Sequence, residues 1–422
     1  MDQGNTAFIL ICAALVLLMT PGLAFFYGGL VKAKSVISMM MMSFGALGLI
    51  GVLWVLYGYA IAFPGAEGTV APWTIDMGAI GLTNLLEVPE GAAYPPLAFA
   101  AFQATFAIIT VALVSGAIAD RAKFGAWMVF AAIWATVVYF PVASWVFNFG
   151  LAEDGSFAYG GWLTHGLQDV FGVGAIDFAG GTAVHINAGA AALALALVLG
   201  KRVGFAKGVS VPHNPPFVLL GAGLLWFGWF GFNAGSELAA DGTAALAFVN
   251  TIAAPAAALL AWLLVEKLKD GKPTSVGAAS GAVAGLVAIT PACGSLTPGW
   301  AIVLGLVAGA VCALAIDLKF KLGFDDSLDV VGIHLVGGLI GTLYLGFFAN
   351  GTGLIYSGEL TQLLVQAIAA FSVLAYSFVL AFVIGFIIEK TMGFRIKNED
   401  EIAGIDTVVH GEEGYVLADS RS

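Results

Sequence analysis

Eleven long apolar runs constrain this chain more than any other feature of its sequence. A helix needs about 20 apolar residues to cross a hydrocarbon core that is ~30 Å thick. The eighth run is short and rich in Gly and Ala. The runs lie at residues 8–30, 36–63, 97–119, 125–147, 178–199, 217–235, 243–265, 276–292, 300–316, 330–348 and 363–388. We therefore expect an all-α integral membrane protein with eleven transmembrane helices.

The composition supports this expectation. Of the 422 residues, 60% are apolar and 10% carry a charge, whereas about 25% of the residues in soluble domains are charged. The mean hydropathy is +0.97. These values exclude a water-soluble enzyme, a disordered chain and a nucleic-acid-binding protein. We expect a transmembrane domain over residues 1–388 and a polar cytoplasmic tail over residues 389–422.

All sixteen Lys and Arg residues fall in alternate loops or in the tail. They are Lys32, Lys34, Arg121, Lys123, Lys201, Arg202, Lys207, Lys267, Lys269, Lys272, Lys319, Lys321, Lys390, Arg395, Lys397 and Arg421. Because cytoplasmic loops carry the excess of Lys and Arg, the pattern predicts an N-terminus outside and a C-terminus inside the cell. Eleven spans also require termini on opposite sides, so the two predictions agree. We expect a multi-pass protein of the inner (plasma) membrane of the cell.

The loops predicted to lie outside carry acidic residues and no basic ones. The acidic residues are Asp2, Glu67, Asp76, Glu87, Glu90, Glu153, Asp154, Asp169, Glu237, Asp241 and Glu359. Such a surface raises the local concentration of cations. Sorting of basic residues to the inside would produce the same pattern without any role in cation attraction.

Two of the five histidines, His185 and His334, lie inside apolar runs. An ionisable group inside a membrane is costly and by default marks a functional pathway, although a lone buried histidine is often a satisfied core residue. Each of the two follows an aspartate at the same spacing, Asp177-x7-His185 and Asp326-x7-His334. The aspartates lie at the edges of their runs. Their plain role is to cap helix ends, and a direct role as cation ligands is the alternative.

The two histidine-bearing runs are the fifth and the tenth, and they cross the membrane in opposite senses. This arrangement predicts a 5+5 inverted pseudo-symmetric repeat, with repeat one at about residues 1–200, repeat two at about 215–350, and an eleventh helix at about 361–388. Such repeats place the substrate path at their interface near the middle of the membrane. We therefore expect His185 and His334 to face each other across this path.

Neutral imidazoles in an apolar path offer one hydrogen-bond donor and one acceptor each. Such a path suits a small neutral polar molecule or a proton relay, and it suits a bare alkali cation badly because no ring of oxygens replaces the hydration shell. Two intramembrane histidines could also ligate haem, as in a b-type cytochrome, which is a rival hypothesis. The three cysteines form no C-x-x-C motif, so a structural metal site is not expected.

Several segments resemble the Amt/Mep/Rh family of ammonium transporters, and specifically its bacterial Amt members. The segments are LMTPGLAFFYGGLV from residue 18, FQATFAIIT from residue 102, GAIADR from residue 116, DFAGGTAVHINAG from residue 177, WFGFNAGS from residue 229 and DDSLDVVGIHLVGG from residue 325. The resemblance extends from the first run to the start of the tail. It implies a homotrimer of eleven-helix subunits, each with its own pore.

The resemblance also implies roles for individual residues. His185 and His334 match the twin histidines of the family pore, and Phe106 and Phe232 match its stacked phenylalanine gate. Without the resemblance, the two phenylalanines would be assigned to ordinary core packing.

The ammonium recruitment site of the family comprises a serine and an aromatic cage. Ser236 matches the serine, and Phe102 matches an aromatic residue near the vestibule. The usual tryptophan of the cage is absent at its expected position, so Phe147, Trp145 or Trp162 could supply the ring.

The implied function is transport rather than enzyme catalysis, with no cofactor. Ammonium is captured at an acidic and aromatic vestibule, loses a proton near the gate, and passes the histidines as ammonia, since desolvating a cation costs far more than desolvating a neutral molecule. An ammonium sensor with the same fold is the alternative function. In some members of the family a PII-type signal protein binds the cytoplasmic face. The segments GFRI from residue 393 and HGEEGY from residue 410 resemble the family tail, and an ordered tail is expected.

Overall fold

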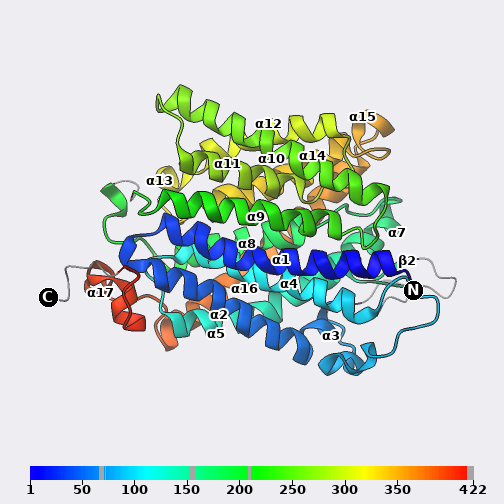
Figure 1. The fold of residues 1–422 in the computed structure, drawn as a ribbon, viewed down its shortest axis with the longest axis horizontal. Helices are drawn as coiled ribbons and strands as arrows, with labels where there is room; N and C mark the ends of the chain where they lie inside the picture. The colour runs from blue at the N-terminus through cyan, green and yellow to red at the C-terminus, as the bar shows by residue number, and fades with distance from the viewer. Residues whose placement is uncertain (66–70, 72, 152–156, 208–210, 416–422) are drawn as a thin grey trace.

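The computed structural model describes residues 1–65, 71, 73–151, 157–207 and 211–415. Four charged residues considered above, Glu67, Glu153, Asp154 and Arg421, lie outside these described residues. Within them, ten helical segments are long and apolar enough to cross a membrane. Figure 1 shows the long helices running side by side along one axis of the molecule.

The α-helices up to residue 199 are α1 (Gln3–Leu30), α2 (Val36–Leu53), α3 (Tyr59–Ala62), α4 (Pro96–Val114), α5 (Phe124–Trp134), α6 (Phe140–Phe147), α7 (Leu167–Phe171) and α8 (Asn187–Leu199). Those that follow are α9 (Pro215–Gly235), α10 (Gly242–Lys269), α11 (Ser275–Ile289), α12 (Pro298–Ala315), α13 (Leu318–Leu322), α14 (Val336–Phe348), α15 (Leu354–Ser357), α16 (Thr361–Thr391) and α17 (Asn398–Ala403). Two short antiparallel strands, β1 (Phe149–Leu151) and β2 (Phe157–Tyr159), form a hairpin after α6.

Short 3₁₀ and π segments complete the helical structure. The 3₁₀ segments are η1 (Ala33–Ser35), η3 (Met77–Leu85), η4 (Ser115–Ile118) and η8 (Phe205–Lys207). The π segments are η2 (Trp54–Gly58), η5 (Ala135–Tyr139), η6 (Trp162–Gly166), η7 (Gly181–Ile186), η9 (Val331–Leu335) and η10 (Asp406–His410). Several of them continue an α-helix, so that η2 and η5 lie within single membrane-sized segments.

The observed helices agree closely with the predicted apolar runs. Ten of the eleven runs coincide with a membrane-sized segment, and the all-helical membrane architecture is confirmed apart from the small hairpin. The eighth run, predicted at 276–292, forms the 15-residue helix α11, which is shorter than the other ten. The count of eleven spans therefore stays a prediction.

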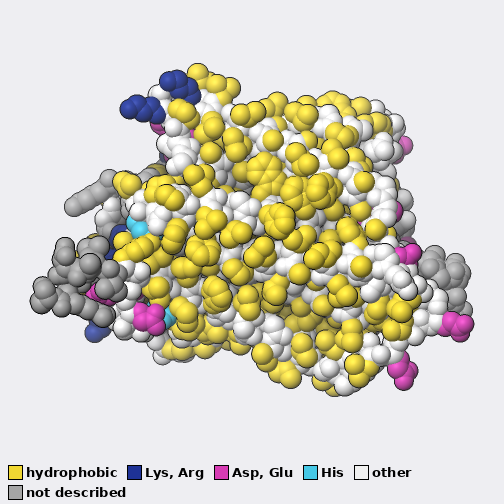
Figure 2. All heavy atoms as spheres, viewed as in Figure 1, with side chains coloured by type: hydrophobic (Ala, Val, Ile, Leu, Met, Phe, Trp, Pro, Cys, Tyr) yellow, Lys and Arg dark blue, Asp and Glu magenta, His cyan; other side chains and the backbone are white. Residues whose placement is uncertain are grey.

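The two ends of the bundle carry different elements. In Figure 1 the N-terminus, α7 and α15 lie at one end, whereas α13 and α17 lie at the other. Figure 2 shows apolar side chains along the length of the visible face, with Lys and Arg side chains near the end that carries α17. The N-terminus and α17 thus lie at opposite ends of the bundle. Which end faces the cytoplasm stays a prediction.

Helices α1 and α9 pack very closely along their length. A Cβ atom added at Gly221 would lie 2.2 Å from the backbone nitrogen of Phe26, and one added at Gly228 would lie 2.6 Å from the carbonyl oxygen of Leu15. Glycine is thus required at both positions for the two backbones to approach, as is usual where membrane helices lack a hydrophobic force that drives them together.

The two histidine-bearing spans begin in the same way. The π segment η7 opens the span that continues as α8, and η9 opens the span that continues as α14. Gly180, with φ of 115°, precedes η7, and Asp329, with φ of 62°, precedes η9 at the equivalent position, five residues before each histidine. This local likeness supports the predicted inverted repeat.

The tail packs against the loops at the end that carries α17. Arg202 pairs with Asp325 at 2.9 Å and with Asp120 at 3.1 Å, and the adjacent Val203 N–H donates to Glu401 of α17 at 2.7 Å. Glu401 also pairs with Arg395 at 3.0 Å. Although burial disfavours its charge, the hydrogen bonds from Arg202 hold the pKa of Asp325 below its usual value.

Candidate functional site

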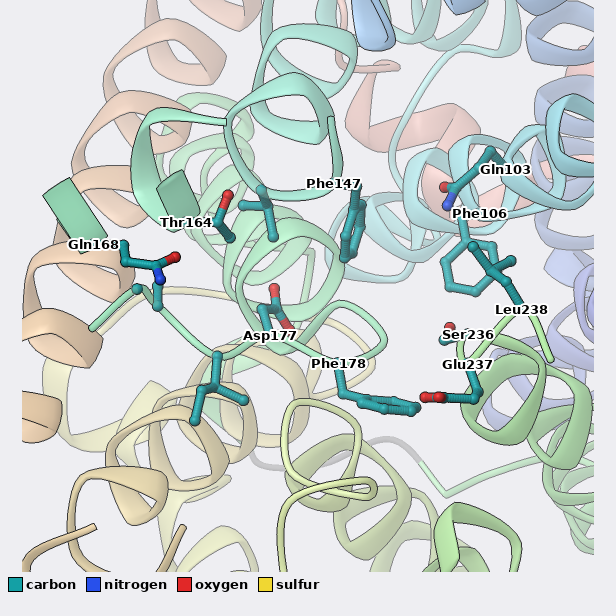
Figure 3. A pocket seen from close by; sticks show the side chains of 14 residues that line it. Gln103, Phe106, Phe147, Thr164, Gln168, Asp177, Phe178, Ser236, Glu237 and Leu238 are labelled. Atoms are coloured by element: carbon teal, nitrogen blue, oxygen red, sulfur yellow. The ribbon is translucent and has the colours of Figure 1, made fainter. Parts of the chain in front are cut away.

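A cavity of about 420 Å³ opens at the end of the bundle that carries the N-terminal residues. It is formed by α4, the end of α6, η6, α7, the loop before η7 and the end of α9. The residues that line it are Gln103, Phe106, Val146, Phe147, Thr164, Gln168, Gly174, Ala175, Ile176, Asp177, Phe178, Ser236, Glu237 and Leu238 (Figure 3). We call it the outer cavity. It combines aromatic rings with hydroxyl, amide and carboxylate groups.

Ser236 lies at the end of α9 and lines the outer cavity. Its hydroxyl donates a hydrogen bond to the carbonyl oxygen of Phe232 at 2.7 Å. Because the hydroxyl proton is used in this bond, the oxygen lone pairs remain available as acceptors toward the cavity. This is the orientation that a cation with N–H donors requires.

Phe147 is the one of the three alternative cage residues that lines the outer cavity. Trp145 packs instead on Trp162, with ring centroids 5.6 Å apart, and on Tyr376, at 4.6 Å. Neither tryptophan is among the described residues that line the cavity. The end of α6 thus exposes Phe147 to the cavity and turns Trp145 toward α16.

Phe102, expected near the vestibule, lies directly behind a residue that lines the outer cavity. Its ring is fully buried and lies against Phe106, at 4.8 Å between centroids. Because the two residues are one helical turn apart on α4, they share a face of the helix. Phe106 is the member of this pair that lines the outer cavity.

Phe106 and Phe232 stack at the bottom of the outer cavity. Their centroids are 4.1 Å apart with an angle of 27° between the ring planes. Phe106 lines the outer cavity, whereas Phe232 lines a separate, much narrower cavity further inside. The stacked pair therefore lies between the two cavities.

The narrow inner cavity is almost entirely apolar and has a volume of about 10 Å³. Its lining residues are Met19, Leu23, Phe26, Ile109, Leu113, Val184, His185, Leu225, Trp229, Phe232, Val283 and His334. The two histidines and Trp229 are its only polar side chains among the described residues. A space of this size holds about one water-sized molecule.

His185 and His334 form a hydrogen-bonded pair. Their Nδ1 atoms are 3.2 Å apart, and both rings are buried. In such a contact one Nδ1 carries a proton and donates the hydrogen bond, while the other Nδ1 accepts that bond, so the two rings have different tautomers. His185 also stacks on Trp229 at 5.4 Å, and its Nε2 has no hydrogen-bond partner among the described residues.

Asp177 and Asp326 lie at the starts of the histidine-bearing spans. Asp177 accepts four backbone N–H groups, those of Gly180, Gly181, Thr182 and Ala183, at 2.5–3.0 Å. Asp326 accepts the N–H of Val331 at 2.7 Å, and burial raises its pKa to about 6. Both geometries are those of helix caps. Asp177 in addition lines the outer cavity.

Gln103, Phe178 and Glu237 are among the lining residues to which the sequence analysis assigns no site role. Gln103 lies next to Phe102 in the FQATF segment, and Phe178 follows Asp177 directly. Glu237, next to Ser236, was noted only as one of the outer acidic residues. Adjacency to assigned residues is the one signal that could have found them.

Comparisons with known proteins agree on one family. Residues 7–415 match the model of the Ammonium Transporter Family. An ammonium transporter of Mycobacterium bovis is 54% identical, over 99% of this chain and 91% of the relative. Among solved structures, a protein described as Sensor Amt Protein has a TM-score of 0.86 at 28% identity, with 96% of this chain and 98% of that chain covered. Mep2 of Saccharomyces cerevisiae has a TM-score of 0.81 at 33% identity, with 94% and 91% covered.

Proposed function

The chain belongs to the Ammonium Transporter Family, and we propose that it captures ammonium in the outer cavity and passes ammonia along the paired histidines. That it is a multi-pass membrane protein and an ammonium transporter follows from the family and from the ten apolar helices. The route through the molecule is the proposal.

Capture takes place beside Ser236 and Phe147. Ammonium carries four N–H donors, and the Ser236 hydroxyl offers an acceptor that faces the cavity. Aromatic faces attract cations, and the rings of Phe147, Phe106 and Phe178 line the same space. Removing water from the cation is thus partly compensated before it reaches the gate.

Ammonium releases its proton to water on the outer side of the Phe106–Phe232 pair, since neither ring can accept it. Beyond this pair the lining is apolar apart from three side chains, and an unpaired cation in such a space is costly. Ammonia, which is neutral, avoids most of that cost. The hydrogen-bonded histidines then offer ammonia a donor and an acceptor along the passage.

One observation carries this proposal more than any other. The outer cavity contains acceptors and aromatic faces, the inner cavity contains the histidine pair, and the stacked phenylalanines lie between them. A path that admits hydrated ions would be wider than the inner cavity, which holds about one water-sized molecule.

The test is a simultaneous recording of current and internal pH in proteoliposomes given an inward ammonium gradient. We expect ammonium-dependent transport that ends when the gradient is removed. A positive inward current would mean that the proton follows the ammonia. Internal alkalinisation without current would mean that it stays outside. If correctly folded protein gave neither a current nor an internal alkalinisation, the proposed function would be contradicted.

Sensing is the second candidate function, because a protein described as Sensor Amt Protein is similar over almost the whole chain. Restored growth of transporter-deficient cells on limiting ammonium would favour transport. A cellular response to ammonium without restored growth would favour sensing.

We also propose that the subunits form a homotrimer in the inner (plasma) membrane, with the tail as the regulatory segment. The contacts of Glu401 and Arg395 with the loop after α8 support an ordered tail. A PII-type signal protein is the candidate partner at this face. The mass of the purified protein and co-purification with a PII protein test these assignments.

A further inference from the structure

We propose that Glu237 is a ligand of the ammonium cation in the outer cavity, so that protonation of this carboxyl weakens capture. The inference rests on the proposed function, which assigns capture to Ser236 and the aromatic rings. It adds a charged acceptor to that site and makes the affinity for small primary ammonium cations depend on external pH.

The backbone at the end of α9 presents three consecutive side chains to the outer cavity. Ser236, Glu237 and Leu238 all line it. Leu238 has φ of 60°, a left-handed conformation that is uncommon for a non-glycine residue, and its N–H donates to Gly235 at 3.0 Å. Figure 3 shows the Glu237 carboxylate beside Ser236 and pointing toward the ring of Phe178.

Glu237 has no cationic partner in the part of the chain that the structure describes. The titratable groups that face it are Asp241, Asp177 and Cys293, and none of them is basic. Half-burial of the side chain, the charge of the nearby Asp241 and a side-chain hydrogen bond with Asp241 raise the pKa of Glu237 to about 7. A partly desolvated carboxylate without a counter-charge favours either a proton or a bound cation.

The other acidic groups near the cavity are already engaged. The oxygens of Asp177 accept four backbone N–H groups. Asp241 accepts the N–H groups of Thr243 and Ala244 at the start of α10. Glu237 hydrogen-bonds to the Asp241 side chain, and it is the carboxyl lining the cavity for which no backbone N–H donor is found among the described residues. The Ser236 oxygen can accept a hydrogen bond from one N–H group of ammonium, and the Glu237 carboxylate can accept one from a second.

The sign of the pH dependence follows from competition between a proton and ammonium for the same oxygens. Above the pKa of Glu237 the carboxylate is charged and binds the cation. As external pH falls through about 7 the group becomes neutral, and the half-saturating ammonium concentration rises. The effect on capture is thus present at alkaline pH and lost at acid pH.

The experiment compares the parent with Glu237→Gln, Glu237→Asp and Glu87→Gln. Glu87→Gln removes the same charge from an exposed loop and is the matched control. Initial transport rates in proteoliposomes are measured against ammonium concentration at external pH 6, 7 and 8. Binding of methylammonium to the purified proteins is measured by calorimetry at pH 8.

We expect Glu237→Gln to raise the half-saturating concentration about tenfold at pH 8, as loss of a hydrogen bond to a charged group implies. Its affinity should then be nearly independent of pH between 6 and 8. Glu237→Asp should retain part of the pH dependence, and Glu87→Gln should match the parent. Methylammonium binding should weaken most in Glu237→Gln and should match the parent in Glu87→Gln.

An unchanged half-saturating concentration and pH profile in Glu237→Gln would overturn the inference, while the proposed transport function would stand. A parent protein that binds methylammonium through Glu237 without transporting ammonium would give the opposite result. The inference would then hold, and the proposed function would fail.

Discussion

At the scale of single residues, the hydrogen bond between His185 and His334 is the contact on which the proposed mechanism depends most. The Nδ1 atoms are 3.2 Å apart in a buried, apolar space. Replacing either histidine with alanine leaves the other ring nitrogen without its partner, at a cost of about 1–3 kcal/mol. Because the two residues act as one unit, the effects of their substitution should not add.

We expect His185→Ala and His334→Ala each to abolish or uncouple transport, and the double substitution to be little worse than either. Ammonium-evoked current and intravesicular pH are measured for all three variants, after intact assembly has been verified. If His334→Ala conducted like the parent while His185→Ala failed, the paired relay would be wrong and His185 would act alone.

The stacking of Phe106 and Phe232 leads to a second prediction at this scale. Phe232→Ala removes a ring that stacks on Phe106 with centroids 4.1 Å apart and contacts the tilted ring of Trp229 at 5.5 Å. Phe-to-Ala changes in cores cost about 3–5 kcal/mol, so the midpoint of thermal unfolding should fall. Productive transport should fall strongly, with a leak for ions. Phe230→Ala is the control, since Phe230 stacks on Phe248 instead.

Normal transport by folded Phe232→Ala, with no leak, would return Phe232 to a packing role. A similar loss of transport in Phe230→Ala would show that general destabilisation, rather than the gate, explains the effect. The comparison of the two variants separates the gate from the core.

At the scale of helices, the sequence predicts the positions of the membrane-sized helices well, but it does not predict where π segments interrupt their α-helical geometry. Hydrophobic length determines where helices can cross a membrane, and the observed segments follow it. The π segments η7 and η9 have no signal in hydropathy, because a π turn and an α turn can be built from residues of the same apolar character. The choice of Phe147 over Trp145 likewise depends on the rotation of α6, which aromatic composition does not determine.

The repeated Asp-x7-His spacing is the exception, since it predicts a local structure that the two spans share. Capping was the plain role assigned to Asp177 and Asp326, and both carboxylates accept backbone N–H groups at the starts of their spans. The spacing identifies the histidines, but the 3.2 Å contact between them required the structure.

The four N–H groups that Asp177 accepts give a prediction at the scale of one helix. Asp177→Asn keeps the shape but has one carbonyl oxygen in place of two carboxylate oxygens, so some of these N–H groups lose their partner at a cost of about 1–3 kcal/mol. We expect a lower midpoint of thermal unfolding and faster hydrogen exchange at residues 180–186. Asp241→Asn, an exposed cap of α10, should change stability by less than about 1 kcal/mol. Equal effects of the two substitutions would argue against a special role for the Asp177 cap.

At the scale of the whole molecule, the distribution of charge and the position of the termini support the same topology. The N-terminus and α17 lie at opposite ends of the bundle (Figure 1), as an odd number of spans requires. The short helix α11 is the element on which that number depends. If α11 failed to cross, the loops on either side of it would face the same compartment.

Accessibility of single cysteines tests this topology directly. Cys12, Cys293 and Cys312 are buried and free, so a cysteine-free variant with small replacements provides the background. Cysteines are then introduced one at a time at Glu359, in the loop between α15 and α16, at Lys272, before α11, and at Lys269, at the end of α10. All three positions are exposed.

Because Lys and Arg are retained on the cytoplasmic side, an impermeant thiol reagent added to intact cells should label the cysteine at Glu359. It should leave those at Lys269 and Lys272 unlabelled until the membrane is opened. The reverse labelling pattern would mean that the molecule has the opposite orientation in the membrane. A cysteine at Gly299, beyond α11 and at the start of α12, tests whether the chain crosses the membrane ten or eleven times. Labelling there from outside means that α11 crosses and the spans number eleven. Protection of both Gly299 and Glu359, with Lys269 and Lys272 also protected, means that α11 does not cross, because two membrane-sized segments separate residues 299 and 359 and keep them on the same side.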